Sequence, residues 1–463
     1  MKPFSIRGFN PCESLLRHSP EQLRTFIRRM KILKMNTIII HYDYGWKRYH
    51  ELIMEECEKA GINIILMTFG PRTFLSYSDW KPRWFAKKTD GTPFTTRLEC
   101  ETYPCRYELE ALEAYAYGAR QWLSSLPPQI KHVHMRAADG LMFCQCEKCR
   151  ILPDHEKWQP FVDVFTKAVL ETRPDLKFET DIYVKRCNIP GNHAPFLAMS
   201  NIMYDTFYRS GRFPIGSHSD SFNAELVQYA ATELNPDADT PNSYHLNRLQ
   251  EWTSTFPGKV YIHENAMGQS LLGTFQYTTD AFLKDLEIYR DLGVQGVCYE
   301  AYEPGYAGFS AMFEILARAM NGEDVSYEPN VLEKTLVQHK IGLFCNDLEF
   351  SIEKYIDDPF RLKQSLLFRE SWLNPTLDLF RRYIHFAFEH EARLDPLMID
   401  YTLAQAGPRT GKYIYKNLSA EAEDFLHRRK LWDFMEDIPL SEDPRAVCRK
   451  VIFELLEKAE ALS

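Results

Sequence analysis

The chain lacks any run of about 18 consecutive apolar residues, the length that a membrane-spanning helix requires. Its densest apolar run, residues 37–40, has instead the length of a buried strand. The first residues also lack the unbroken apolar segment of a secretory signal, because Arg7 and several polar residues interrupt them. We therefore expect a cytoplasmic protein without a membrane partner.

The sequence also has no excess of basic over acidic residues. Lys and Arg total 55 against 64 Asp and Glu, the two signs are interspersed, and the net charge is −9. Proteins that bind a phosphate backbone or an anionic membrane usually carry a concentrated basic surface. The charge therefore argues against nucleic acid as a partner.

The sequence also lacks the signs of a disulfide scaffold. Its 11 cysteines are an odd number and are spread through a chain that is long enough to bury a core without cross-links. We expect them to be reduced thiols or metal ligands.

Short apolar runs alternate with amphipathic helical stretches over the first 320 or so residues, a pattern typical of parallel βα units. One such helix is predicted where Leu23, Phe26 and Ile27 share a face with Met30 and Leu33. Eight βα units in succession predict a closed (β/α)8 TIM barrel. The eight strand-like runs are residues 4–9, 37–42, 62–68, 132–136, 177–183, 201–207, 259–263 and 296–302.

The pattern changes after Asn321-Gly322, where helical segments follow one another without a convincing strand. We predict two domains, a barrel over residues 1–322 and a C-terminal α-helical domain over residues 323–463. The connection is short and has no flexible Gly/Ser run, so we expect the helical domain to pack against the barrel. Its helices could also form a homodimer.

Carboxylates follow several predicted strands, at the ends where a TIM barrel places its catalytic groups. Asp139, Asp205, Glu264 and Glu300 follow strands four, six, seven and eight. Cleavage of a glycosidic bond needs one carboxyl group that protonates the leaving oxygen and one that activates water or attacks the sugar. These four residues could supply both, although each alone could equally be a turn residue, a helix cap or a solvated acid.

Aromatic and polar residues near the same strand ends suit a small carbohydrate, because a ring packs on the apolar face of a sugar while polar groups bind its hydroxyls. For Arg7 two roles stay open. It could clamp a substrate carboxylate, as on a uronic acid, or pair with a barrel acid such as Glu264 or Glu300. The candidate binding residues are Arg7, His41, Asp43, Trp46, Tyr183, Tyr204, Asn265 and Tyr302.

Cys144, Cys146 and Cys149 form a C-x-C-x-x-C motif shortly after Asp139. Three thiols so close together in a reducing compartment are usually metal ligands, and zinc suits a structural site of four ligands. An all-thiolate site leaves no open position for water, so we expect a structural ion that braces the loop carrying Asp139. Candidates for the fourth ligand are Cys100, Cys105 and His155.

The segment Ala137-Ala138-Asp139-Gly140, followed by this cysteine motif, resembles a large, mostly uncharacterised bacterial family of TIM barrels related to glycoside hydrolases. The resemblance covers roughly residues 1–320, and the cysteine motif is its specific part. It implies a fourth cysteine before the third helix, here Cys100, and a tyrosine at the end of strand five, here Tyr183.

More distantly, the barrel is similar to the alpha-glucuronidases of glycoside hydrolase family 67 and the hexosaminidases of family 20. The first similarity implies that Asp139 is the general acid and that Asp205 and Glu264 activate water. Hexosaminidases have an Asp-Glu pair after strand four, whereas this chain has Ala138-Asp139. That departure argues against substrate-assisted cleavage.

We therefore predict a glycoside hydrolase that acts on an oligosaccharide or a glycoside, uronides included, with Glu300 in reserve as base or nucleophile. One alternative is a non-catalytic, zinc-braced sugar-binding barrel, because a fold does not fix a function. Another is a metal-dependent sugar isomerase or lyase that uses His41, Asp43 and His263. Carboxylates that face one another in the mouth favour hydrolysis, whereas metal ligands converging there favour the isomerase or lyase.

Overall fold

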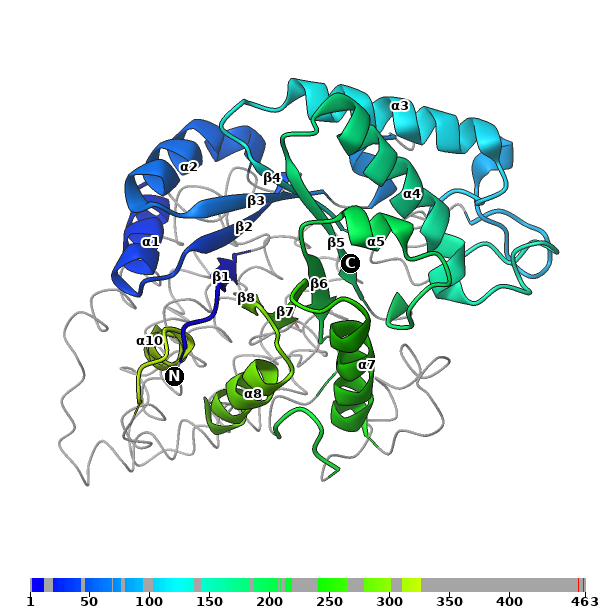
Figure 1. The fold of residues 1–463 in the computed structure, drawn as a ribbon. Helices are drawn as coiled ribbons and strands as arrows, with labels where there is room; N and C mark the ends of the chain where they lie inside the picture. Colours follow the sequence, from blue (N-terminus) through cyan, green and yellow to red (C-terminus); the bar gives the residue numbers. More distant parts are fainter. Residues whose placement is uncertain are drawn as a thin grey trace. The chain divides into compact units, whose positions relative to one another are not determined.

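Eight parallel strands pair in sequence order and close into a barrel. Each strand overlaps one of the predicted runs, so the predicted (β/α)8 architecture is confirmed (Figure 1). The strands are β1 (Ile6–Asn10), β2 (Thr37–His41), β3 (Asn63–Met67), β4 (His132–Met135), β5 (Lys177–Ile182), β6 (Ile202–Asp205), β7 (Val260–Glu264) and β8 (Gly296–Glu300).

This computed structural model describes only part of the chain, in two compact units. The first unit holds the barrel and comprises Met1–Ala266, Thr278–Ala301 and Ala317–Glu323. The second comprises Met267–Tyr277, Tyr302–Leu316 and Asp324–Ser463, so the predicted helical domain lies almost wholly outside the described residues. The described residues are 2–11, 20–42, 46–68, 70–75, 80–94, 103–136, 143–183, 186–206, 209, 213–218, 240–264, 279–300 and 310–325, with 457 and 461.

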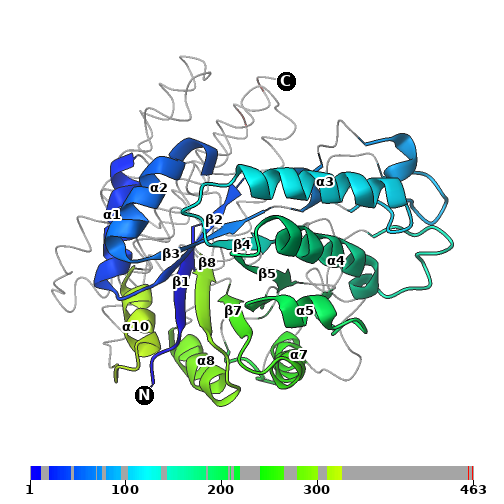
Figure 2. The same cartoon turned by 45° about the horizontal axis from the view of Figure 1, so that its top comes forward.

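Helices alternate with the strands and surround them, as Figures 1 and 2 show for α1 to α8. The predicted helix after the first strand is present as α1, and its Leu23, Phe26, Ile27 and Met30 are buried. None of the described helices is both long and apolar enough to cross a membrane. The helices are α1 (Pro20–Ile32), α2 (Lys47–Ala60), α3 (Leu109–Ser125), α4 (Asp154–Thr172), α5 (Ala194–Ala198), α7 (Pro241–Thr255), α8 (Thr279–Asp291) and α10 (Ser310–Met320), with the 3-10 turns η3 (Pro71–Thr73) and η5 (Pro82–Trp84).

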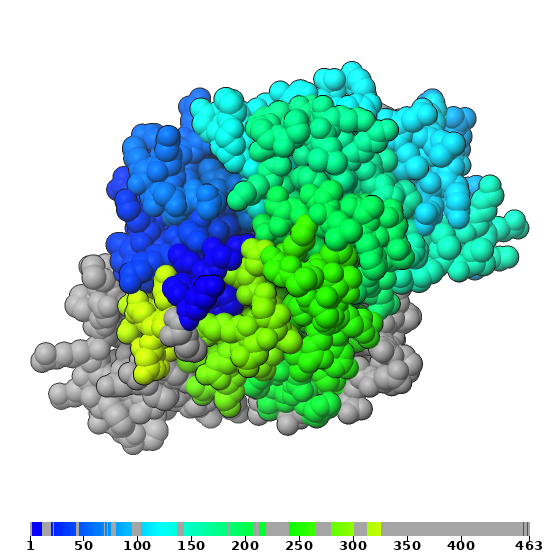
Figure 3. Space-filling view, in the orientation of Figure 1, coloured from blue at the N-terminus to red at the C-terminus, as the bar shows by residue number. Residues whose placement is uncertain are grey.

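The barrel closes where β1 pairs with β8, from Ile6 opposite Gly296 to Asn10 opposite Glu300. A Cβ atom on Gly296 would lie 1.7 Å from the Ile6 carbonyl oxygen, so only glycine allows this approach of the two backbones. The space-filling view shows the N-terminal residues, in blue, beside the yellow-green segment that contains β8 (Figure 3).

The barrel interior is apolar on one side. Side chains alternate between the two faces of a strand, so those that meet here come from every second position. The apolar interior residues are Ile39, Ile65, Met67, Met203, Tyr261 and Cys298, with Ile6 packed against them.

The β4 and β5 side of the interior carries charge instead. The Glu179 carboxylate lies 2.8 Å from His134 Nδ1 and 2.9 Å from His132 Nε2, and it accepts a 2.5 Å hydrogen bond from the Tyr261 hydroxyl. Burial raises the pKa of Glu179, but the two imidazoles outweigh it and hold that pKa well below its usual range. A buried carboxylate is thus ionised within the core.

Candidate active site at the barrel mouth

Four polar residues point into the barrel mouth, because each lies two positions beyond an apolar interior residue of its own strand. They lie at or next to the ends of β2, β6, β7 and β8, at the face where TIM barrels carry their active sites. The structure thus brings three predicted site residues to one place, together with His263, which the sequence suggested only as a metal ligand. The four are His41, Asp205, His263 and Glu300.

The His263 imidazole lies between two carboxylates. Its Nδ1 is 2.9 Å from Asp205 Oδ2, and its Nε2 is 3.2 Å from Glu300 Oε2. The Asn10 amide, from β1, approaches His263 Nε2 at 3.0 Å and His41 Nε2 at 3.4 Å. The side chains of Asp205, His263 and Glu300 are at most 2% exposed. We call these three residues the mouth cluster.

Charge in the mouth cluster favours an imidazolium. Burial alone would lower the pKa of His263, but Asp205 and Glu300 raise it above its ordinary value, against a smaller opposing effect of Arg136. An imidazolium with a carboxylate on each side can hold or pass a proton near neutral pH. The arrangement therefore suits general acid–base chemistry.

Arg136 and Tyr183 extend the mouth on the β4 and β5 side. Arg136 follows β4, and its Nη1 lies 3.9 Å from the sulfur of Met67, an interior residue. Its guanidinium lies 5.2 Å from the centre of the Tyr183 ring, which Arg186 also approaches at 5.4 Å. Tyr183, a predicted binding residue, is therefore in contact with two buried arginines.

Glu264 lies on the opposite face of β7 from His263. Its carboxylate binds Arg209 and accepts hydrogen bonds from Thr206 and from Tyr289 of α8. The structure does not bring Glu264 to Asp205 in the mouth, so their predicted water-activating pair is corrected. The physical reason is the strand alternation, which sends adjacent residues to opposite faces.

Two further predicted binding residues also face away from the mouth. The Tyr204 hydroxyl lies 3.1 Å from His245 Nδ1 of α7, on the outer side of β6. Arg7 lies near the start of β1, where its Nε donates to the Lys34 carbonyl and its Nη1 to the Phe4 carbonyl. The predictions that Tyr204 and Arg7 line the mouth are therefore corrected. Trp46 is buried and packs on His50 of α2, with ring centres 5.8 Å apart.

Five predicted site residues lie outside the described residues, so the structure gives no position for them. Among them is the predicted general acid, in the segment that follows β4. They are Asp43, Cys100, Asp139, Asn265 and Tyr302.

Four cysteines gather beside the barrel. The sulfurs of Cys105, Cys144, Cys146 and Cys149 all lie within 4.8 Å of one another and could hold a metal ion. Cys105 Sγ is 3.9 Å from Cys146 Sγ and 3.7 Å from Cys149 Sγ, and the Lys87 amide donates to Cys144 Sγ at 3.3 Å. The fourth thiol in the described part of the chain is thus Cys105, the second of the candidates considered above.

One sulfur of this cysteine cluster is prepared to be a thiolate. Hydrogen bonds from the Cys105 and Cys149 thiols outweigh burial and lower the pKa of Cys144 to about 2. Because the thiolate is the form that binds metals, the cluster has the chemistry of a metal site.

Sequence reasoning missed Asn10 and Arg136, and considered His263 only as a metal ligand. A signal for all three was present in the alternation of interior residues along each strand. Counting in steps of two from Tyr261 gives His263, and the same step from His134 gives Arg136.

No family model matches the chain, and no curated protein matches its sequence. Among solved structures it is similar to the endo-beta-1,4-mannanase from Thermotoga petrophila, with 10% identity over 70% of this chain and 79% of that one, at a TM-score of 0.42.

Two other solved structures show a comparable similarity. The endo-1,4-beta-mannanase from Rhizomucor miehei has 8% identity over 70% of this chain and 96% of that one, with a TM-score of 0.41. A catalytic mutant of a GH42 beta-galactosidase from G. stearothermophilus has 9% identity over 74% of this chain and 64% of that one, with a TM-score of 0.44.

Proposed function

We propose that the chain is a glycoside hydrolase whose mouth cluster activates the attacking water. The observation that supports this most is the buried His263 imidazole held between the carboxylates of Asp205 and Glu300. Glycosidic cleavage needs a carboxylate with free capacity beside the sugar, and Glu300 has this capacity: His263 is its one side-chain partner among the described residues.

Each member of the cluster then has its own task. Asp205 orients the His263 ring, as a carboxylate does in other acid–base groups. His263 holds a proton, and its positive charge keeps Glu300 ionised. Glu300 takes a proton from water as the water oxygen attacks the anomeric carbon. The bond to the leaving oxygen breaks, and Asp139 supplies the proton that this oxygen needs.

The substrate we propose is a short oligosaccharide or a glycoside, with uronides as one candidate class. Arg136 supports the uronide because it reaches the mouth, and a guanidinium binds a carboxylate through paired hydrogen bonds. Arg136 would then take one of the two roles left open for Arg7, that of clamping a substrate carboxylate. We place the reaction in the cytoplasm, on imported sugars.

A metal-dependent isomerase or lyase fits the mouth less well. Both ring nitrogens of His263 face carboxylates rather than a shared open position. In the described part of the chain, the group suited to a metal is the cysteine cluster.

We also propose that the cysteine cluster holds a structural zinc ion. A tetrahedral site with Zn–S bonds of about 2.3 Å has sulfurs about 3.8 Å apart, which agrees with the separations from Cys105. Disulfide sulfurs would lie much closer, at about 2.0 Å. The ion would join the segment before α3, which carries Cys105, to the loop after β4, which carries the other three cysteines.

Elemental analysis tests the zinc proposal. Protein purified without chelators should contain close to one zinc per chain, and Cys146→Ser should lose most of it together with thermal stability. Cys187→Ser, at a buried cysteine outside the cluster, is the matched control and should keep the metal. Metal-free wild-type protein, or a Cys146→Ser protein that is as stable as wild type, argues against the site.

The proposed function is tested by a screen of aryl glycosides and uronides, followed by Asp139→Asn. A general acid matters for a poor leaving group and much less for a good one. The variant should therefore lose most activity on an alkyl glycoside but keep far more on an activated phenyl glycoside. Undiminished turnover of the alkyl glycoside would remove Asp139 from the mechanism.

A further inference from the structure

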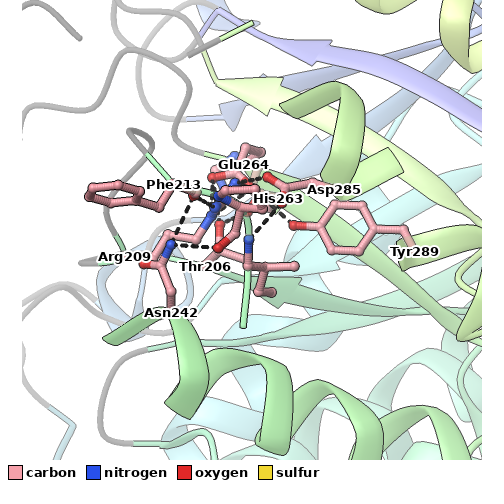
Figure 4. Close-up of polar contacts among 10 residues, drawn as sticks. Thr206, Arg209, Phe213, Asn242, His263, Glu264, Asp285 and Tyr289 are labelled. Carbon is pink, nitrogen blue, oxygen red and sulfur yellow. Dashed lines mark hydrogen bonds and ion pairs between the residues drawn. The ribbon is translucent and has the colours of Figure 1, made fainter. Parts of the chain in front are cut away.

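A second buried charge cluster lies on the outer face of the same two strand ends. The Arg209 guanidinium lies between Glu264 of β7 and Asp285 of α8 (Figure 4), and all three side chains are at most 4% exposed. Arg209 Nε is 3.1 Å from Glu264 Oε1, and Arg209 Nη2 is 2.9 Å from Glu264 Oε2 and 2.5 Å from Asp285 Oδ2. We call these three residues the outer clamp.

The outer clamp involves the residues that directly follow two members of the mouth cluster in the sequence. Thr206 directly follows Asp205, and its hydroxyl donates to Glu264 Oε1 at 2.8 Å. Glu264 directly follows His263, and the Arg209 amide donates to the Thr206 carbonyl at 3.2 Å. The outer contacts therefore join the same two strand ends whose inner side chains meet as Asp205 and His263.

The outer clamp also ties down the described part of the loop after β6. Arg209 Nη1 donates to the Phe213 carbonyl at 3.3 Å, and the Ile215 amide donates to Asp285 Oδ1 at 2.6 Å. Asn242, in the first turn of α7, donates to the Phe213 carbonyl at 2.9 Å. The polypeptide that leaves Asp205 is thus held at several points (Figure 4).

The geometry of a guanidinium explains why charge is used here rather than apolar packing. Its donors lie in one plane at fixed angles, so two carboxylates bound to it are fixed in direction as well as in distance. Burial opposes the charge of Arg209, but Asp285 and Glu264 raise its pKa well above the ordinary value. The guanidinium of Arg209 therefore stays charged despite its burial.

We propose that Arg209 is a positioning residue, which sets the β6 and β7 ends so that Asp205 stays bonded to His263 in the mouth. The proposal rests on the proposed function in so far as that contact serves catalysis. A displacement of about 1 Å in an active site can cost 10²-fold in rate, so a loose clamp should act on kcat rather than on substrate binding.

Arg209→Lys tests this, because lysine keeps the positive charge but loses the planar set of donors. The variant should fold, lose about 10- to 100-fold in kcat, and change KM by less than about twofold. The ¹⁵N-labelled His263 imidazole, assigned with His263→Gln, should lose the downfield Nδ1 proton signal that its bond to Asp205 produces. A folded Arg209→Lys enzyme with wild-type kcat and an unchanged signal would overturn the proposal.

Two further variants distinguish a positioning role of Arg209 from an effect on stability alone. Arg209→Met/Glu264→Gln/Asp285→Asn removes the clamp charges together, so it can fold where Arg209→Lys does not, and it should also lose the His263 signal. Lys157→Met breaks a comparably buried ion pair with Asp154 on α4, 2.8 Å long, and should lower stability without changing kcat. A triple variant that keeps the signal refutes the positioning role. The NMR signal can be measured even if the protein cleaves no glycoside. A failure of the positioning proposal can therefore be distinguished from a failure of the proposed function.

Discussion

The mouth cluster and the outer clamp have the same composition, two carboxylates around one cation, yet they differ in how fully their carboxylates are bonded. Glu264 accepts hydrogen bonds from Arg209, Thr206 and Tyr289, so little of its capacity remains. Glu300 has His263 as its side-chain partner among the described residues. A carboxylate with spare capacity can bind water or substrate, whereas a saturated one can only hold structure.

The cations differ as well. The imidazolium of His263 can pass its proton to a base, whereas the Arg209 guanidinium cannot. The inner cluster is therefore able to exchange protons with a substrate, whereas the cation of the outer clamp is permanently charged. The two clusters meet at adjacent positions of β7, His263 and Glu264, so one step along the chain separates chemistry from support.

The largest expected effect comes from Glu300→Gln in the mouth cluster. Loss of a general base typically costs about 10²- to 10⁴-fold in rate, and we expect kcat on a glycoside to fall by this amount. The free energy of unfolding should change little, because the Asp205–His263 pair remains balanced in charge. Steady-state kinetics with urea unfolding measures both. An active Glu300→Gln enzyme would remove the distinction between the two clusters.

Glu264→Gln in the outer clamp should show the opposite balance. The glutamine amide would present hydrogens to the Arg209 donors, so we expect the unfolding free energy to fall by about 3 kcal/mol, as when a buried ion pair loses a partner. The loss in kcat should be smaller than for Glu300→Gln. A stable Glu264→Gln protein with kcat as low as that of Glu300→Gln would return Glu264 to the chemistry.

The pH dependence of stability should identify Asp285 as the weakly ionised member of the clamp. Burial, aided by Glu264 and opposed by Arg209, raises the pKa of Asp285 from 3.8 to about 6. Between pH 3.8 and about 6, the native state therefore binds more protons at Asp285 than the unfolded state does. The stabilisation from this group is complete below pH 3.8 and is lost as the pH rises through about 6.

Asp285→Asn removes that titration, whatever the fixed cost of the substitution. Between pH 4 and pH 7 the variant should therefore gain stability relative to wild type, by up to about 3 kcal/mol. Urea unfolding at several pH values measures the difference. Asp291→Asn, an exposed acid of the same helix, is the control and should show no such trend. A difference between Asp285→Asn and wild type that is independent of pH contradicts the assignment.

The smallest effect is expected from Tyr204→Phe, on the outer face of β6. This change removes one neutral hydrogen bond to His245, so stability should fall by about 1 kcal/mol while kcat stays the same. Thermal unfolding and kinetics check it. A tenfold loss of kcat would show that the outer face of β6 takes part in catalysis.

The barrel itself could be predicted from sequence because burial on both faces makes parallel strands apolar throughout, and β2 is buried at all five positions. The end of each strand could be located to within two residues, and two of the acids named there, Asp205 and Glu300, both lie beside His263. Helix α1 followed from the spacing of Leu23, Phe26 and Ile27.

The face of the sheet to which each strand-end side chain points was harder to predict, because an error of one position moves the side chain to the opposite face. Glu264 and Tyr204 were assigned to the mouth for this reason. Arg7 was misplaced because the first strand begins at Ile6, which leaves the arginine near the opposite end of the barrel from the mouth. Cys105 could not be chosen over its neighbours, since the loop path that brings it to Cys149 has no periodicity to follow.

Closure of the barrel between β1 and β8 has a consequence for biosynthesis. The seam joins residues 290 positions apart, from Ser5 to Gln295. At about 5–20 residues per second, a ribosome needs roughly 15–60 s between making the first strand and making its last partner. For that time β1 has β2 on one side and an unpaired edge on the other, and such an edge can recruit strands from neighbouring chains. Slow translation near β8 would thus be expected to lower the yield of native protein, even though it leaves the finished barrel unchanged.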